Sequence, residues 1–219
     1  MTGLNSNRLK LLALLTMTVD HIGVHLLPQY TLLRIIGRLA FPIYAFFIAE
    51  GCAHTKNRKK YLLQMAGMAL LCQLVYLLAM GSLFQCILVT FTLSILTIYA
   101  IDSGATVKAV TALCAVVFLT VFLPQWLPHT DFAVDYGLWG VLLPVAVYLA
   151  KTRQQKLVCA AISLTLLALQ YGGVQWYGLL ALAPLALYDG TRGSRKLKWL
   201  FYWYYPLHLV AIYAVGLLL

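Results

Sequence analysis

Apolar segments long enough to cross a bilayer recur along almost the whole chain. Of its 219 residues, 63% are hydrophobic and only 10% are charged, whereas soluble domains have about half apolar and a quarter charged residues. This composition excludes a disordered chain, a disulfide scaffold and an ordinary water-soluble domain. The sequence therefore predicts an all-α, polytopic membrane helix bundle that forms a single domain over residues 1–219.

The apolar segments predict about nine transmembrane helices. A helix needs about 20 residues to cross the hydrocarbon core. The expected spans are 10–27, 32–52, 61–80, 83–101, 106–123, 136–150, 156–171, 174–188 and 199–218. The seventh and eighth are separated only by Gly172 and Gly173, so an alternative is that they form one re-entrant pair.

The basic residues orient this bundle. Lys and Arg total 16 against six Asp and Glu, which gives a formal charge of +10. With the N-terminus inside, all basic residues except Arg34 and Arg38 fall in or beside the inner segments, as is typical of cytoplasmic loops. We therefore expect the N-terminus inside and the C-terminus outside. The charge is explained by topology, and no motif for nucleic-acid binding is present, so no nucleic-acid partner is expected.

The cysteines give no sign of a metal site or of a disulfide framework. No CxxC motif or Cys/His cluster occurs in the sequence. We expect all five to be small packing residues in or beside the apolar segments: Cys52, Cys72, Cys86, Cys114 and Cys159. No metal is predicted.

Ionisable residues inside the predicted helices mark the candidate site. Each costs about 2.5–3.5 kcal/mol to insert and usually faces the bundle interior. With a rise of about 1.5 Å per residue, His21 lies about 16 Å from Lys10, and His208 lies about 14 Å from the start of the last helix. Arg38 lies about 10 Å below the outer end of the second helix. These depths bring His21, with Asp20, to the level of Arg38 and His208.

Two interpretations of this group remain. Asp20 and Arg38 are either a buried ion pair that fixes the helix register, with the histidines as hydrogen-bonded contacts, or part of a working site. Two histidines, a carboxylate and a guanidinium at one depth favour proton transfer and stabilisation of an anion.

A second group lies near the inner face. Glu50 and His54 share one face of the second helix, and the cations that follow are explained by topology or by docking of a phosphate-bearing ligand. The loop that contains Arg192 and Arg195 fits the same role.

Three segments carry a family resemblance: KLLALLTMTVDHIG (10–23), RIIGRLAFPIYAFFIAEGCAHTKNRKKYLLQM (34–65) and YDGTRGSRKLKWLFYWYYPLHLVAIY (188–213). They resemble the TraX family, whose name-giving member is the F-pilin acetylase of conjugative plasmids. The resemblance implies a multi-pass acetyltransferase of the bacterial inner (cytoplasmic) membrane that uses acetyl-CoA. The chain is also similar to membrane acyltransferases that O-acylate sugars, in which a basic residue, ten further residues and a histidine mark the first helix. Lys10 and His21 have this spacing.

The interpretation as an acetyl-transfer site assigns a role to each candidate residue. His21 acts as general base, Asp20 pairs with Arg38, and Arg38 or His208 stabilises the oxyanion, with Tyr205 as a further donor. The phosphates of acetyl-CoA dock on the inner side, where the candidate residues are Lys10, Glu50, His54, Arg58, Lys59, Lys60, Arg192 and Arg195.

The predicted function is therefore acetyl transfer from cytosolic acetyl-CoA to an amine or hydroxyl acceptor at the outer side. The acceptor, whether a protein amino terminus, a sugar or another small molecule, does not carry over from the family. A proton-coupled transporter and a non-catalytic membrane assembly scaffold are the alternatives, because intramembrane ionisable residues also occur in carriers.

Overall fold

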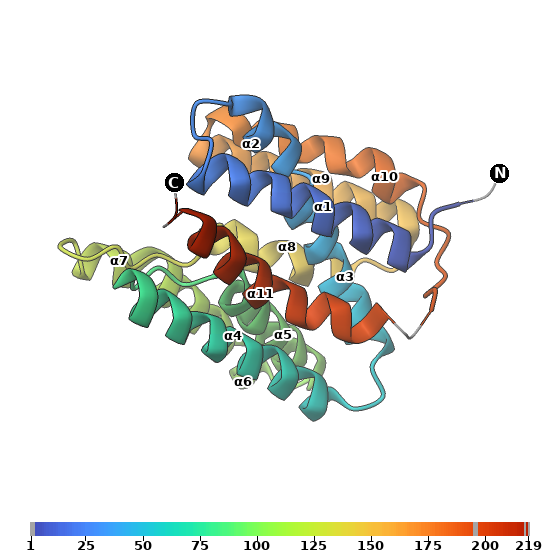
Figure 1. Ribbon diagram of the computed structural model, residues 1–219. Helices are drawn as coiled ribbons and strands as arrows, with labels where there is room; N and C mark the ends of the chain where they lie inside the picture. The colour runs from blue at the N-terminus through green and yellow to red at the C-terminus, as the bar shows by residue number, and fades with distance from the viewer. Residues whose placement is uncertain (1–2, 195–196, 217, 219) are drawn as a thin grey trace. The chain divides into compact units, whose positions relative to one another are not determined.

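The computed structural model describes residues 3–194, 197–216 and 218, and Figure 1 shows that these residues are helical with connecting loops. Within these ranges, β-pairing is limited to the isolated bridges Leu4–Tyr188 and Gln85–Val134, so the predicted all-α class is confirmed. The helical segments are α1 (Ser6–His25), α2 (Thr31–Gly37), α3 (Ala40–His54), α4 (Arg58–Met80), α5 (Ile87–Asp102), α6 (Thr106–Val117), the π-helical η1 (Phe118–Phe122), α7 (Leu123–Trp126), α8 (Gly137–Leu149), α9 (Arg153–Tyr171), the 3-10 helix η2 (Gly173–Ala181), α10 (Leu182–Ala186) and α11 (Lys198–Gly216).

Each predicted span overlaps a helical segment, but several boundaries were wrong. α1 and α4 begin before the apolar segments because Asn5 and Asn57 cap them: their side chains accept the backbone N–H of Arg8 at 3.0 Å and of Lys60 at 2.8 Å. α5 begins at Ile87 instead of residue 83. The polar caps lie outside the hydrophobic pattern, so that pattern misses the first turn.

The second predicted helix is interrupted. α2 ends at Gly37, a turn covers Arg38 and Leu39, and α3 begins at Ala40. Pro42 lies in the first turn of α3, where the missing N–H does not remove a helical hydrogen bond. The break sets Arg38 at the C-terminal end of α2, beside the polar cluster described below.

The eighth predicted helix is largely a 3-10 helix. It is preceded by Gly172 and begins at Gly173, and the φ values of these two residues, 65° and 51°, favour glycine. Its nine residues, Gly173–Ala181, exceed the three or four residues that are usual for this helix type. Whether this segment spans or re-enters the membrane stays a prediction.

Among the described residues, three helical stretches are long and apolar enough to cross a membrane: Thr31–His54, Arg58–Leu78 and Thr106–Trp126. Two shorter apolar helices are Ile87–Asp102 and Gly137–Leu149. These stretches are those of a membrane protein. The inside and outside assignment stays a prediction.

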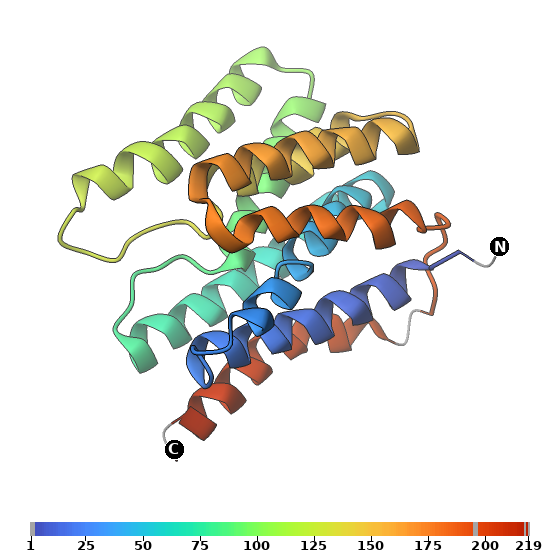
Figure 2. The same ribbon diagram turned by 90° about the horizontal axis from the view of Figure 1, so that it is seen from above.

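The chain divides into two compact units, and the prediction of a single domain stays a prediction. Unit 1 comprises residues 1–47 and 160–219, and unit 2 comprises residues 48–159. In unit 1, α1 packs against both α2 and α11, as Figures 1 and 2 show. α1 therefore contacts two helices from opposite ends of the sequence.

Unit 2 is built around α5, which contacts α4, α6 and α8. The Ser94 hydroxyl donates to the carbonyl of Val141 at 2.8 Å and ties α5 to α8. At one end of the unit Arg58 pairs with Asp102, and at the other Ser82 donates to Asp131. The predicted topology has the two partners of each pair on the same side of the membrane.

The cysteines partly follow expectation. Cys52, Cys72 and Cys86 are buried and all five thiols are free. Cys114 is exposed on α6, so the expectation that it is a packing residue does not hold within its unit.

Candidate functional site

The adjacent residues Asp20 and His21 of α1 contact different helices. Successive helical residues are rotated by about 100°, so Asp20 and His21 cannot point the same way. Asp20 bonds to arginines of the α2 segment, whereas His21 contacts His208 of α11. The sequence thus builds two polar clusters at one level of unit 1.

Asp20 lies between two arginines. Nη2 of Arg38 donates to both carboxylate oxygens at 2.6 Å, and Nη1 of Arg34 donates to Oδ2 at 3.0 Å. The exposed side-chain fractions are 12% for Asp20, 5% for Arg38 and 30% for Arg34. The predicted Asp20–Arg38 pair is confirmed, and Arg34 is a further partner that sequence reasoning left unassigned.

The arginine cluster is held closely by its surroundings. A Cβ at Gly37 would lie 2.2 Å from the Asp20 side chain, so glycine is needed where α2 approaches α1. Nε of Arg38 donates to the Arg34 carbonyl at 3.3 Å, and Nη1 donates to Oε1 of Gln175 at 3.4 Å. Gln175 lies in η2, and no sequence signal linked this residue to Arg38.

The imidazoles of His21 and His208 are in contact, and their other hydrogen bonds determine which one donates and which one accepts. Nδ1 of His208 lies 2.9 Å from the Tyr204 carbonyl, so in the neutral ring this nitrogen carries the proton. Its Nε2 is then an acceptor, 3.3 Å from Nδ1 of His21. Nδ1 of His21 also lies 2.8 Å from the Met17 carbonyl, so it too is the protonated nitrogen. The lone pair of neutral His21 is therefore on Nε2.

Further rings surround this pair. Tyr205 lies edge-on to His21 and His208, with ring centroids 6.2 Å and 5.4 Å away. His25 stacks on His21 at 6.2 Å, and Tyr204 stacks on His208 at 5.2 Å. His25 was missed as a site residue, although its spacing of four residues from His21 places both on one face of α1.

The start of α1 is fastened to the loop after α10. Leu4 exchanges backbone hydrogen bonds with residues 187 and 189, the Ser6 N–H donates to the Thr191 carbonyl at 2.9 Å, and the Asn7 amide donates to the Ser194 carbonyl at 2.8 Å. We call residues 3–7 with 187–194 the clasp. Within it, the Thr191 hydroxyl and N–H hydrogen-bond Asp189 and hold the pKa of that carboxyl below its usual value. The loop therefore carries a charged Asp189 near neutral pH.

The clasp brings two candidate cations together. Nζ of Lys10 lies 5.0 Å from the ring centroid of Phe47 and 5.7 Å from that of Phe201, which stabilises its positive charge. Arg192 is close enough for electrostatic repulsion with Lys10. The predicted partner Arg195 lies outside the described residues.

The other predicted donor-binding residues belong to unit 2, and three of them have protein partners. Oε1 of Glu50 pairs with Lys156, and Oε2 of Glu50 lies 3.9 Å from Nδ1 of His54. Arg58 pairs with Asp102 and lies over Tyr99. The remaining two, Lys59 and Lys60, are exposed.

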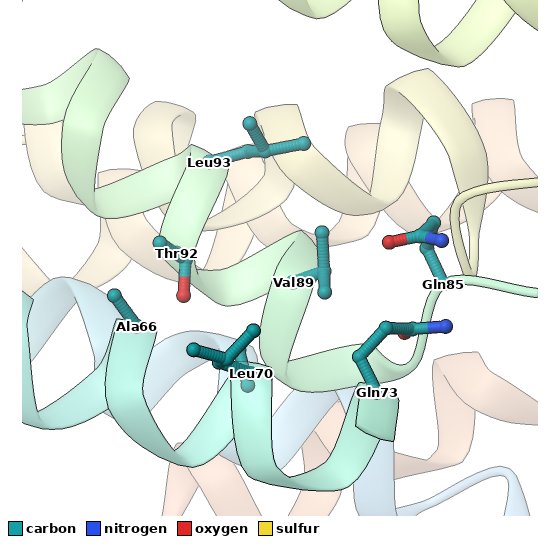
Figure 3. Close-up of a pocket in the computed structure, with 8 residues that line it drawn as sticks. Ala66, Leu70, Gln73, Gln85, Val89, Thr92 and Leu93 are labelled. Atoms are coloured by element: carbon teal, nitrogen blue, oxygen red, sulfur yellow. The ribbon is translucent and has the colours of Figure 1, made fainter. Parts of the chain in front are cut away.

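Unit 2 also contains a hollow of about 240 Å³ between α4 and α5. Figure 3 shows that Gln73 and Gln85 lie beside each other in its lining. The Gln73 amide donates to the Phe84 carbonyl at 2.9 Å. The lining residues are Ala66, Ala69, Leu70, Gln73, Gln85, Val89, Thr92 and Leu93. None of these is ionisable, so they supply no acid or base.

Unit 1 therefore combines an imidazole that has an available lone pair, a second imidazole that orients it, and a fixed ion pair. Such a group can accept a proton from a bound amine or hydroxyl. Over the residues that the structure describes, no three His, Cys, Asp or Glu side chains are grouped as a metal site would require.

Comparisons with known proteins identify the family. A family model described as TraX protein matches residues 5–216. The chain is 26% identical over 226 residues to the probable fimbrial assembly protein FimC, serogroup H1, of Dichelobacter nodosus, and this match covers 94% of this chain and 93% of the relative. A short match of 39 residues, 56% identical, joins it to an uncharacterized protein of Rickettsia prowazekii (strain Madrid E) and covers 18% of this chain and 16% of that protein. No solved structure matches. Since the family match extends from the N-terminal cap of α1 to the end of α11, the chain belongs to the TraX family.

Proposed function

We propose that this protein transfers an acetyl group from acetyl-CoA to an amine or hydroxyl group of an acceptor. The observation that carries the proposal is the contact between the two imidazoles, in which buried His208 orients His21 so that Nε2 of His21 keeps its lone pair. Membership of the TraX family, which is associated with pilin acetylation, supports the same reaction class.

Each residue then has a role in the transfer. The amine nitrogen or hydroxyl oxygen of the acceptor bonds to the acetyl carbonyl carbon, and Nε2 of His21 takes the proton from that nitrogen or oxygen. The carbon–sulfur bond breaks next, and protonated His21 returns its proton to the leaving sulfur. His208 positions His21, because in the neutral pair its Nε2 accepts and has no proton for an oxyanion. The Tyr205 hydroxyl is the proposed oxyanion donor.

Arg38 is proposed to support the site through Asp20. Its guanidinium binds both oxygens of that carboxylate and reaches Gln175. This arrangement fixes α1 against α2 and η2, and thereby the rotation of α1 that presents His21.

The residues of unit 1 fit an acyl-CoA donor. Lys10 and Arg192 form a positive pair beside the clasp, and cations of this kind bind phosphates. Lys10 and His21 are eleven residues apart on α1, a rise of about 16 Å. We propose that the donor's phosphates lie at this pair, on the inner side of a bacterial inner membrane, and that the acceptor approaches from the outer side.

A second candidate is a membrane scaffold for fimbrial assembly. It is favoured by the name of the relative from Dichelobacter nodosus, which is called a probable fimbrial assembly protein. Acetyl transfer and fimbrial assembly are compatible for one class of acceptor. The amino terminus of a pilin-like protein would be both the amine that is acetylated and part of the assembly partner.

The test uses membranes that contain the full chain and radiolabelled acetyl-CoA. We expect label to move to an endogenous acceptor with the wild-type protein and not with His21→Ala. Lys108→Gln, which alters an exposed cation outside the site, serves as the control. Equal labelling by wild type and His21→Ala would overturn the proposal. A scaffold would assemble fimbriae equally well with His21→Ala.

A further inference from the structure

Arg34 brings a second positive charge to the Asp20 carboxylate, whose negative charge Arg38 already neutralises. Asp20 is the one acidic side chain within the helices of unit 1, since Asp189 lies in the loop after α10. Arg38 occupies both oxygens of Asp20 at 2.6 Å, and Arg34 adds a third hydrogen bond at 3.0 Å. Two guanidiniums and one carboxylate leave the cluster with a net charge of +1.

This excess charge is accessible. Arg34 is 30% exposed, whereas Arg38 is only 5% exposed. A guanidinium has five N–H donors, and the Arg34 side chain uses one of them toward a residue in the described part of the chain. Uncompensated charge in a membrane helix is expensive and marks a ligand path. The remaining donors suit a planar anion that binds two of them at once.

Arg34 also lies near the imidazole pair. It is within electrostatic range of His25, and His25 stacks on His21 with ring centroids 6.2 Å apart. α2 approaches α1 closely here because Gly23 has no side chain: a Cβ there would lie 2.8 Å from Cβ of Leu33, the residue before Arg34. One imidazole therefore separates Arg34 from the proposed base.

We infer that Arg34 binds an anionic group of the acceptor, a carboxylate or a phosphate, while His21 acts on its amine or hydroxyl. This inference rests on the proposed acetyl transfer and narrows its substrate class. The acceptor is an acidic amine or alcohol, or a larger molecule with an anionic group close to the acetylated one. Arg34 is then a specificity-determining residue.

The test measures anion binding without acetyl-CoA. The full chain in a neutral, phosphate-free detergent is titrated with inorganic phosphate while its Tm is followed. We expect a saturable rise in Tm with wild type and with Lys108→Gln. With Arg34→Gln, which keeps the Asp20–Arg38 pair, at least about ten times more phosphate is needed for the same rise. Should Arg34→Gln fold poorly, Arg34→Lys keeps the charge and loses only the two-point contact, so a weaker response there supports the inference.

Equal phosphate responses in wild type and the Arg34 variants would overturn the inference. A lipid headgroup is the other source of phosphate, so the titration is repeated in phosphatidylglycerol and in phosphatidylcholine nanodiscs. If phosphatidylglycerol alone stabilises the protein through Arg34 and removes the phosphate response, the anion is lipid and the acceptor assignment is overturned.

A second measurement separates this inference from the proposed function. At saturating acetyl-CoA, which occupies the proposed phosphate site at Lys10 and Arg192, phosphate should still compete with the acceptor in the labelling assay, and Arg34→Gln should remove that competition. If the wild-type protein transfers label while phosphate leaves the acceptor KM unchanged, the inference fails and acetyl transfer stands. If Arg34-dependent phosphate binding occurs and no label is transferred, acetyl transfer fails.

Discussion

Nε2 of His208 lies 3.3 Å from Nδ1 of His21, although 187 positions separate the two residues in the chain. α11 brings His208 to α1, and the Tyr204 carbonyl one turn earlier in α11 fixes its tautomer. This contact and the Met17 carbonyl, 2.8 Å from Nδ1 of His21, together decide which nitrogen of His21 is basic. The contact gives the two histidines distinct roles, one as the base and one as the residue that orients it.

Loss of His21 should cost more turnover than loss of His208. General base catalysis contributes about 10²–10⁴-fold, so folded His21→Ala should lose this factor in kcat with little change in Tm. His208→Ala removes one of the two contacts that orient the His21 imidazole and leaves the Met17 carbonyl. We therefore expect a smaller loss, of up to about 100-fold in kcat, with an unchanged KM. Steady-state kinetics at saturating acetyl-CoA measure both.

His208→Gln is the matched control for that prediction. Its side-chain oxygen accepts the Nδ1–H of His21 as the imidazole does, so part of the kcat should return. A larger loss with His208→Ala than with His21→Ala would reverse the two roles.

Asp20→Ala should be the most destabilising change in the arginine cluster. It leaves two guanidiniums without their carboxylate, and removing one partner of a buried pair costs about 3–5 kcal/mol. Arg38→Ala should cost less, because Asp20 keeps Arg34. Arg34→Ala, at a half-buried site, should cost about 1 kcal/mol or less. Thermal unfolding in detergent gives the order.

The double variant Asp20→Ala with Arg38→Ala tests the coupling. Because it removes both buried charges of the pair, it should be less destabilised than the sum of the single variants. A stable but inactive Arg38→Ala protein would instead show that the arginine acts on the reaction and not through Asp20.

The clasp should depend on Gly193. Its φ is +71° and a Cβ would lie 2.9 Å from Cγ of Asn7, so Gly193→Ala combines backbone strain of about 1–3 kcal/mol with a clash. We expect faster proteolysis of residues 187–194 and a lower Tm. Gly190→Ala, with φ of +80° and no atom within 4 Å, should show the strain alone.

Gly67→Ala completes that series. Gly67 lies within α4, and a Cβ there would meet no atom within 4 Å. Alanine in a helix is favoured over glycine by about 0.5–1 kcal/mol, so this variant should not be destabilised. Equal effects at Gly193 and Gly67 would contradict the role of the clasp.

The depth argument predicted part of the site because a helix has a fixed rise per residue. It placed His21, Arg38 and His208 at one level, and the structure confirms the contacts of Asp20 with Arg38 and of His21 with His208. Depth does not give rotation about the helix axis. The depth argument therefore did not reveal that Arg34 also faces Asp20. The four-residue spacing of His21 and His25 was the signal that these two share a face of α1.

Other features have no sequence pattern of their own. The clasp depends mainly on backbone hydrogen bonds, which any side chain permits. Gln175 contacts Arg38 from a 3-10 helix although the two residues are 137 positions apart in the chain. The apolar segment that contains Gln175 fits an α-helix as well as a 3-10 helix, so its sequence did not predict this geometry. The cations near residue 58 were predictable as a group, but the pairing of Arg58 with Asp102 needed the packing of α4 against α5.

The orientation of the chain can be tested across α8. This helix has 13 residues, a length of about 20 Å, whereas the hydrocarbon core is about 30 Å thick. In a cysteine-free background, an impermeant maleimide should label His129→Cys in intact spheroplasts and Lys151→Cys only after lysis. The reverse pattern would invert the topology, and labelling of both from outside would show that α8 does not span.

The exposed cations should govern the affinity for acetyl-CoA. A charge-assisted contact contributes about 1.5–3 kcal/mol, so Arg192→Ala should raise the KM for acetyl-CoA by about tenfold or more. The double variant Lys59→Ala with Lys60→Ala tests the cluster of unit 2 without breaking the Arg58–Asp102 pair. Because salt screens such contacts, the KM of a variant that has lost one should respond less to ionic strength than that of the wild type. Lys108→Ala, which removes an exposed cation elsewhere in unit 2, should leave the KM unchanged.

If Arg192→Ala raises the KM for acetyl-CoA and the double variant does not, the phosphates of acetyl-CoA lie at the clasp, and Lys59 and Lys60 act only in topology. If neither changes it, both groups of cations act only as topology signals.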